Sequence, residues 1–259
     1  MNLHKQLQAN LKEMQLSEMT EIQKNVISLI DQGKDVMGCS KTGSGKTIAF
    51  LLPIVNKLLN NEIPHTPAAN GVSFPVAIVL APTRELTEQI YAEARKICYK
   101  TNINVTRVYG GVPHGPQIRE LRNGADIIIA TPGRLNDFIM NSHIDLKLTH
   151  NLIIDEADRM LDMGFEPQIN KIIYDYGMPS KENRQNLFFS ATFTKEVKEL
   201  AKNFMNNYYF ISVNNNNEAI VNENIKHLLI KASKGVENEK IIEIIKELKG
   251  SILSKFLLN

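Results

Sequence analysis

The chain has 259 residues, of which 43% are hydrophobic and 22% charged, which is the balance of an ordinary globular protein. Its 30 basic and 28 acidic residues leave a formal charge of +2, so composition alone does not single out a nucleic-acid-binding protein. The two cysteines and six histidines fall outside any metal-ligand spacing, and no apolar run approaches the ~18 residues that a membrane span needs. The N-terminus also lacks a secretory pattern, so we expect an intracellular protein built around one large domain.

Short apolar, β-branched runs alternate with helical patterns between residues 35 and 213. Several runs are continuously apolar, which is typical of strands buried on both faces of a sheet. Repeated strand-then-helix units therefore predict a parallel sheet covered by helices on both sides. The predicted strands are 35–38, 76–80, 104–109, 126–130, 151–155, 186–190 and 208–212, and segments 84–100 and 194–206 have helical spacing.

One stretch between these elements has the composition of a loop. Residues 60–75 contain three prolines, three asparagines and a glycine, and they predict a surface insertion.

Residues 40–47 read Ser-Lys-Thr-Gly-Ser-Gly-Lys-Thr, follow a predicted strand and open a helix, which is the setting of a phosphate-binding loop. Glycines in such a loop let backbone N–H groups point at phosphate oxygens, and the helix adds its positive N-terminus. Lys46 would neutralise the β- and γ-phosphates, and the Thr47 hydroxyl would bind Mg²⁺. A Gly-Ser-rich turn is the alternative, but the intact Gly-Lys-Thr favours nucleotide binding. The predicted loop contacts are Ser40, Thr42, Gly43, Ser44, Gly45, Lys46 and Thr47.

A second polar motif, Asp-Glu-Ala-Asp, occupies residues 155–158 at the end of an apolar run. A carboxylate that leaves a buried strand beside a phosphate loop is placed to hold Mg²⁺ through water, which suits Asp155. Glu156 is then placed to orient or deprotonate the attacking water. An acidic helix N-terminus is the structural alternative. The phosphate loop upstream favours the catalytic interpretation, in which Lys46 takes part with both acids.

Residues 155–169 read Asp-Glu-Ala-Asp-Arg-Met-Leu-Asp-Met-Gly-Phe-Glu-Pro-Gln-Ile and resemble the DEAD-box ATP-dependent RNA helicases, with the Vasa-like branch the nearest. Four further segments match in the family's order: 82–86, 110–111, 131–134 and 190–192. The resemblance covers residues 3 to 231. It implies a RecA-like P-loop α/β domain with a central parallel sheet flanked by helices on both faces. Such a domain would bind ATP, Mg²⁺ and single-stranded or duplex RNA, the RNA through its backbone without regard to sequence.

The resemblance also assigns roles to single residues. Gln23 would recognise adenine, because an amide satisfies both the donor and the acceptor on its edge. Asp158, Ser190 and Thr192 would link the nucleotide site to a partner domain. The residues assigned to RNA also have a local structural interpretation, in which the prolines end strands, the threonines cap helices and the glycine pair makes a turn. The structural and the RNA-binding interpretations can both hold. The RNA contacts are assigned to Pro82, Thr83, Arg84, Gly110, Gly111, Thr131, Pro132, Gly133 and Arg134.

Three places depart from the family pattern. Met19 and Glu21 replace two prolines of the adenine segment, which leaves that segment less restricted before folding. Gln15-Leu16 stands where the family has glycine and an aromatic residue. Ser40 replaces the alanine that usually opens the phosphate loop, a small change that we expect to be tolerated.

The resemblance divides the chain into three parts: adenine-recognition N-terminal helices (1–34), a RecA-like ATP-binding helicase domain (35–217), and a linker with the truncated stub of a second RecA-like domain (218–259). The family's second domain carries arginines that complete hydrolysis, so we expect slow ATP turnover by this chain alone. We expect a cytoplasmic monomer without membrane contact, with the nucleus or ribonucleoprotein granules as alternative locations.

Two other functions are consistent with parts of the sequence. One is an ATP-independent RNA-binding module that competes with the complete helicase. The other is a P-loop ATPase of a different class, which the five ordered motifs argue against.

Overall fold

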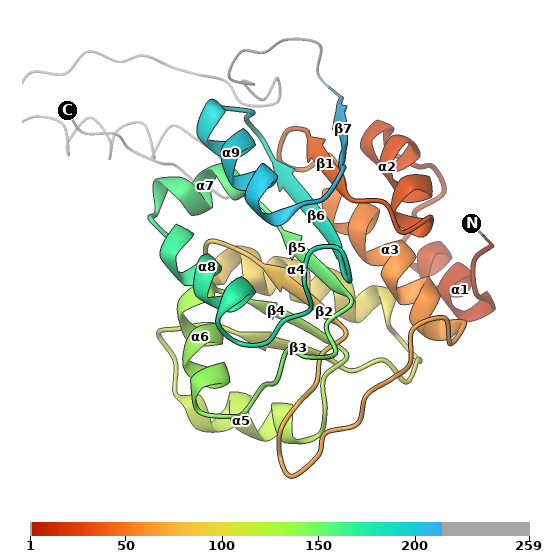
Figure 1. Ribbon diagram of the computed structural model, residues 1–259. Helices are drawn as coiled ribbons and strands as arrows, with labels where there is room; N and C mark the ends of the chain where they lie inside the picture. Colours follow the sequence, from red (N-terminus) through yellow and green to blue (C-terminus); the bar gives the residue numbers. More distant parts are fainter. Residues whose placement is uncertain (1, 214–259) are drawn as a thin grey trace, which may run out of the picture. The chain divides into compact units, whose positions relative to one another are not determined.

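The structure is a computed structural model that describes residues 2–213, and its core is a seven-stranded, wholly parallel sheet (Figure 1). Each strand lies within one residue of its predicted bounds, so the predicted α/β fold is confirmed. The strands are β1 (Val36–Cys39), β2 (Ala77–Leu80), β3 (Val105–Val108), β4 (Ile127–Ala130), β5 (Asn151–Ile154), β6 (Gln185–Ser190) and β7 (Tyr209–Ser212). The predicted linker and stub, 218–259, lie outside the described residues.

Helices fill the connections between these strands within the described part of the chain. The predicted segments 84–100 and 194–206 correspond to α4 and α9. The helices are α1 (Lys5–Glu13), α2 (Glu21–Asp31), α3 (Lys46–Leu59), α4 (Arg84–Ile97), α5 (His114–Arg122), α6 (Pro132–Met140), α7 (Ala157–Asp162), α8 (Glu166–Tyr174) and α9 (Lys195–Phe204). No helix among residues 2–213 has the length and apolarity of a membrane span.

The sheet is buried on both faces, because alternate residues of each inner strand pack into two separate hydrophobic cores. In β2, Ala77 and Val79 join the core beneath α1 to α4, whereas Ile78 and Leu80 join the core beneath α5 to α9. Figure 1 shows α1 to α3, in red and orange, on one side and α6 to α9, in green to cyan, on the other. Apolar side chains of the inner strands are therefore committed to packing, whereas the edge strand β7 is largely exposed.

The strand order is β3-β4-β2-β5-β6-β1-β7, which rearranges the order of the motifs along the chain. Because all strands are parallel, every carboxyl end lies at the same edge of the sheet. The predicted RNA segments leave β2, β3 and β4, which are neighbours in the sheet. The predicted nucleotide segments leave β1, β5 and β6, which form the adjoining block. Two contiguous blocks of chemistry therefore share one edge.

The segments outside the strand–helix repeats are held by specific contacts. Asn10 of α1 donates from its side-chain amide to the carbonyl oxygens of Ile97 and Tyr99 at the end of α4, 2.7 Å from each. The predicted loop 60–75 is confirmed, and it is fastened where His65 lies 3.0 Å from the carboxylate of Asp126. The N-terminal helices and this loop therefore belong to the same packed body as the sheet.

Helices α1 and α2 end with the same hydrogen-bond pattern. In α1 the N–H of Leu16 donates to the carbonyl of Leu11, and in α2 the N–H of Lys34 donates to that of Leu29. Such a C-terminal cap places one residue in the left-handed region, where glycine is favoured. That residue is Gly33 in α2, with φ 75°, but it is Gln15 in α1, with φ 58°. Gln15 stands where the sequence departs from the family's glycine, so the departure carries backbone strain.

We therefore expect Gln15→Gly to raise the free energy of unfolding by about 0.5 to 1 kcal/mol, because relief of the strained φ exceeds the added entropy of the unfolded chain. Gly33→Ala is the matched control and should lower it by about 1 kcal/mol, since a Cβ on Gly33 meets no described atom within 4 Å and only φ is affected. Urea unfolding of the three proteins measures both effects. Shifts of the same sign in the two variants would contradict this account.

Candidate nucleotide site and nucleic-acid surface

The predicted phosphate loop lies between the end of β1 and the start of α3, as the sequence indicates. Gly43 and Gly45 both have positive φ, 77° and 91°, which glycine adopts without strain. A Cβ on Gly43 would meet no described atom within 4 Å, so the loop is open there. A Cβ on Gly45 would lie 2.5 Å from the amide nitrogen of Gln23. Gly45 is thus required by the approach of a second segment as well as by its backbone.

Lys46 begins α3 and is folded back over the loop. Its side chain is buried, and Nζ donates to the carbonyl oxygen of Ser40 over 2.9 Å. The hydroxyls of Ser40 and Ser44 lie 2.8 Å apart, so the serine that replaces the family's alanine adds a contact across the loop. A buried cation, an open glycine and a helix N-terminus at one point fit a bound phosphate group.

Gln23 lies against the phosphate loop rather than open to solvent. Its Oε1 accepts a hydrogen bond from the N–H of Thr20 (2.9 Å), and its Nε2 donates to the carbonyl of Gly45 (3.0 Å). Gln23 completes a capping box at the start of α2. The family resemblance assigns this glutamine to adenine, whereas its capping role is signalled by the spacing Thr20-x-x-Gln23.

Asp155 and Glu156 follow β5 directly. Asp155 is buried, and burial raises the pKa of its carboxyl to about 6, against the opposing effect of the Lys46 charge. Its Oδ1 accepts the N–H of Glu156 over 2.9 Å. Glu156 has left-handed backbone, φ 51° and ψ 51°, and Arg159 holds its carboxylate at 2.6 Å. A strained residue beside a buried acid is a common property of functional sites.

Of the three residues predicted to link the nucleotide site to a partner domain, Asp158 and Thr192 are hydrogen-bonded to each other. Oδ2 of Asp158 accepts hydrogen bonds from both the N–H (3.0 Å) and the hydroxyl (2.9 Å) of Thr192. The Ser190 hydroxyl is buried and has no hydrogen-bond partner among residues 2–213. Asp158 and Thr192 therefore tie the loop after β5 to the loop after β6.

The residues predicted to hold Mg²⁺ fit a hydrated ion rather than a cage of protein ligands. No cluster of three or more His, Cys, Asp or Glu side chains in residues 2–213 is placed to hold a metal. Mg²⁺ at nucleotide sites usually keeps several waters and takes one or two protein ligands with phosphate oxygens. Thr47 and Asp155 offer one hydroxyl and one carboxylate. The Thr47 side chain is hydrogen-bonded to Glu93 of α4, whose pKa is raised by burial.

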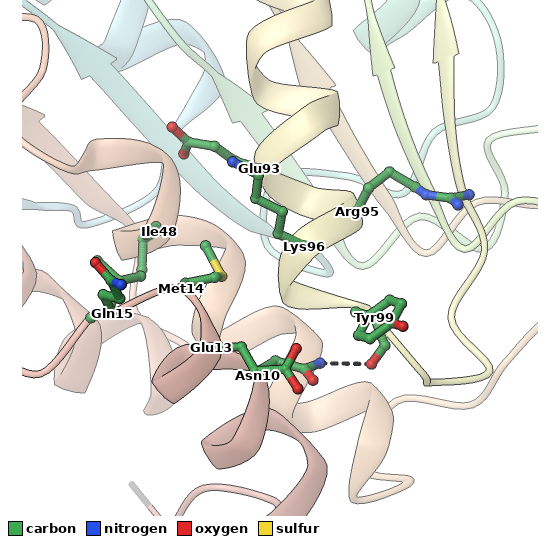
Figure 2. A pocket seen from close by; sticks show the side chains of 10 residues that line it. Asn10, Glu13, Met14, Gln15, Ile48, Glu93, Arg95, Lys96 and Tyr99 are labelled. Carbon is green, nitrogen blue, oxygen red and sulfur yellow. Dashed lines mark hydrogen bonds between the residues drawn. The ribbon is translucent and has the colours of Figure 1, made fainter.

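A cavity of about 740 Å³ lies between the end of α1, the start of α3 and the face of α4 (Figure 2). Figure 2 shows Met14, Gln15 and Ile48 on one side of this cavity and Tyr99 on the other, where the Tyr99 carbonyl accepts a hydrogen bond from Asn10. None of the predicted nucleotide contacts lines it. The phosphate loop therefore lies outside this cavity, and only Thr42 and Gly43 of it are exposed.

The predicted RNA contacts divide into exposed residues and residues that shape the surface. Pro82 and Pro132 are buried, and so is Arg134, whose Nη2 donates to the carbonyl of Val112 over 3.1 Å. Arg134 therefore supports the loop after Gly111, and its Nη1 has no partner among the described residues. Thr83 and Thr131 are half-buried. The exposed contacts are Arg84, Gly110, Gly111 and Gly133.

Comparison with known proteins identifies the family of this chain. The profile of the DEAD/DEAH box helicases matches residues 20–200. The chain belongs to the DEAD/DEAH box helicase family. It is also similar to the crystal structure of a hypothetical ATP-dependent RNA helicase from Sulfolobus tokodaii, with 38% sequence identity and a TM-score of 0.69. That alignment covers 82% of this chain and 57% of the other, so this DEAD/DEAH box chain spans a little over half the length of the archaeal protein.

The buried Asp155 of this helicase domain should make its stability depend on pH. Its pKa rises from 3.8 to about 6 on folding, so the folded protein binds the proton more tightly than the unfolded chain between these values. The stabilisation by the proton on Asp155 is therefore complete below about pH 4 and is lost as the pH rises through 6.

We expect the free energy of unfolding of wild type to fall by a few kcal/mol relative to that of Asp155→Asn between about pH 4 and pH 7, because the asparagine carries no charge to bury. Urea unfolding measures both free energies. The difference between the two proteins is the measured quantity, since all other groups titrate in both. A difference that stays constant over this range would contradict the raised pKa.

Proposed function

We propose that this chain is the ATP- and RNA-binding N-terminal part of an ATP-dependent RNA helicase of the Vasa-like branch. In the full-length protein it would act with a second RecA-like domain to couple ATP hydrolysis to local strand separation or remodelling of ribonucleoproteins. The observation that carries the proposal is the shared sheet edge, where Lys46, Asp155 and Glu156 in one block adjoin the exposed glycines of the other. The branch assignment is supported by the run of residues 155–169.

The residues of the nucleotide block suit hydrolysis of a phosphoanhydride. Lys46 would exchange the carbonyl of Ser40 for phosphate oxygens, which offer a charged acceptor. Thr47 and Asp155 would hold Mg²⁺, which when bound neutralises charge on the phosphates. Glu156 would accept the proton of the attacking water or orient it. Because Arg159 pairs with Glu156 in this structure, that carboxylate is already held in one orientation.

The Asp158–Thr192 pair suits a relay between the nucleotide block and a partner domain. It joins loops that leave neighbouring strands, so a shift of the loop after β5 would be transmitted to the loop after β6. Closure of two domains around ATP and RNA is a common way to convert such local changes into work.

The exposed glycines support RNA binding by a separate argument. Gly110 and Gly133 have ordinary φ, and a Cβ on either would meet no described atom within 4 Å. Neither conformation nor packing within the described part of the chain therefore requires glycine there. Close approach of another molecule to the backbone does, and a phosphodiester chain that accepts backbone N–H groups fits this surface.

The nucleotide half of the proposal is tested by titrating a fluorescent ATP analogue with Mg²⁺. Wild type and Glu156→Gln should bind it alike, whereas Lys46→Ala should bind at least tenfold more weakly, because a charge-assisted contact worth more than about 1.4 kcal/mol is lost. Lys34→Ala, an exposed lysine before the opposite end of the same strand, is the matched control and should bind as wild type does.

Hydrolysis should be close to background in both wild type and Glu156→Gln, with and without single-stranded RNA, because a second domain would supply the arginines that complete the site. Equal binding by Lys46→Ala and wild type would contradict the nucleotide site. Robust turnover that Glu156→Gln abolishes would instead show that this chain needs no second domain.

The RNA half is tested by Gly133→Ala. Gly133 is the second residue of α6, where alanine should raise the free energy of unfolding by up to about 1 kcal/mol. The same methyl group should lower RNA affinity severalfold, since it occupies space that the phosphate chain would approach. Gly115→Ala is the matched control, because Gly115 is the second residue of α5 with equally open space but lies outside the predicted motifs. Fluorescence anisotropy with labelled RNA and urea unfolding separate the two effects; equal RNA affinities for all three proteins would contradict the proposed surface.

A further inference from the structure

Tyr109 lies beneath the exposed Arg84 at the border of the RNA surface. The guanidinium carbon of Arg84 is 5.0 Å from the centre of the Tyr109 ring, which is the arrangement of a cation–π contact. Tyr109 itself is only 6% exposed and directly precedes the glycine pair. The ring therefore forms a floor under a side chain whose guanidinium remains open to solvent.

The orientation of this ring is fixed at its hydroxyl. The Tyr109 hydroxyl donates a hydrogen bond to Oε1 of Glu88, which lies one turn after Arg84 in α4. The same oxygen pairs with Nε of Arg107 at 3.0 Å. Glu88 thus joins α4 to β3 through two partners, and the phenol ring cannot turn without breaking its bond to the carboxylate.

The backbone of Tyr109 is fixed as well. Gln117 of α5 accepts from the N–H of Tyr109 (2.9 Å) and donates to its carbonyl (3.2 Å), both through the side-chain amide. The Gln117 amide thus satisfies both backbone groups of Tyr109, as a neighbouring strand would, just beyond the end of β3. Both ends of Tyr109 are therefore held, whereas the arginine above it is a long side chain with many rotamers.

We propose that Tyr109 is a positioning residue that holds Arg84 in the orientation in which it binds an RNA phosphate. Ordering a free arginine costs much of what a phosphate contact contributes, and a rigid aromatic floor reduces that cost before RNA arrives. Tyr109 acts through Arg84 and through no contact of its own with RNA. This inference rests on the proposed RNA-binding function and adds to it the residue that prepares the contact.

The experiment is a double-mutant cycle on RNA binding, measured by anisotropy of a labelled ten-nucleotide oligouridine between about 50 and 200 mM salt. Arg84→Ala should weaken binding about tenfold and reduce the slope of log K against log salt by about 0.7, because one phosphate contact to a single strand is lost. Tyr109→Leu should weaken binding about threefold and reduce the slope in the same direction. In the Arg84→Ala background, Tyr109→Leu should have no further effect.

Two variants distinguish positioning from folding. Tyr109→Phe keeps the ring and removes only the hydroxyl, so it remains informative where Tyr109→Leu is too unstable; its effect should be smaller and should also vanish in the Arg84→Ala background. Tyr91→Leu is the matched control. The Tyr91 ring makes a similar cation–π contact, with the guanidinium carbon of Arg107 4.3 Å from its centre, but on the part of α4 away from the glycine pair. Tyr91→Leu should leave the salt slope unchanged.

Independent effects of Arg84→Ala and the Tyr109 variants, or an unchanged slope in both Tyr109 variants, would overturn the inference while RNA binding itself stands. Absence of salt-dependent RNA binding by the wild-type chain would overturn the proposed RNA-binding function, and the inference with it.

Discussion

Burial of the sheet on both faces is the constraint on which the rest of this molecule depends. Alternate apolar side chains of each inner strand enter two different hydrophobic cores, so these side chains are not available for chemistry. Residues at or beyond the carboxyl ends are free to bind or react, and parallel strands bring all of those ends to one edge. The loops there are short and lead directly into helices. Each loop therefore combines a fixed strand end with a helix N-terminus, a rigid base for groups that must be held in place.

The nucleotide block gathers the features that a well-packed protein normally avoids. Asp155 is a buried acid, Glu156 has left-handed backbone, and the Ser190 hydroxyl is buried without a partner among the described residues. Each feature costs free energy, and such features persist where the surrounding structure over-determines them. The two cores supply that support. The gathering of these costly features around Lys46 is a physical reason, independent of sequence motifs, to place the candidate site there.

Helix α4 contacts both blocks. Its first residue, Arg84, lies over Tyr109 beside the glycine pair, and Glu93, more than two turns later, shares a hydrogen bond with Thr47 at the phosphate loop. The Asp158–Thr192 pair connects loops within the nucleotide block. One helix therefore contacts a residue of each candidate site, Tyr109 at the exposed glycines and Thr47 at the phosphate loop.

The sequence by itself determined the local events: short apolar, β-branched runs predicted all seven strands, and the Gly-Lys-Thr and Asp-Glu-Ala-Asp spacings predicted which loops form the candidate nucleotide site. The strand predictions are confirmed because periodicity and backbone requirements act over a few residues. The tertiary structure alone decided that the interleaved motifs separate into two blocks, because strand order depends on contacts between residues far apart in the chain. It also decided that Arg134, Pro82 and Pro132 are buried. Likewise, only the tertiary structure shows that Gln23 is hydrogen-bonded to the phosphate loop and that Tyr109 lies under Arg84. Such pairings join elements distant in sequence, and no local pattern encodes which of them meet.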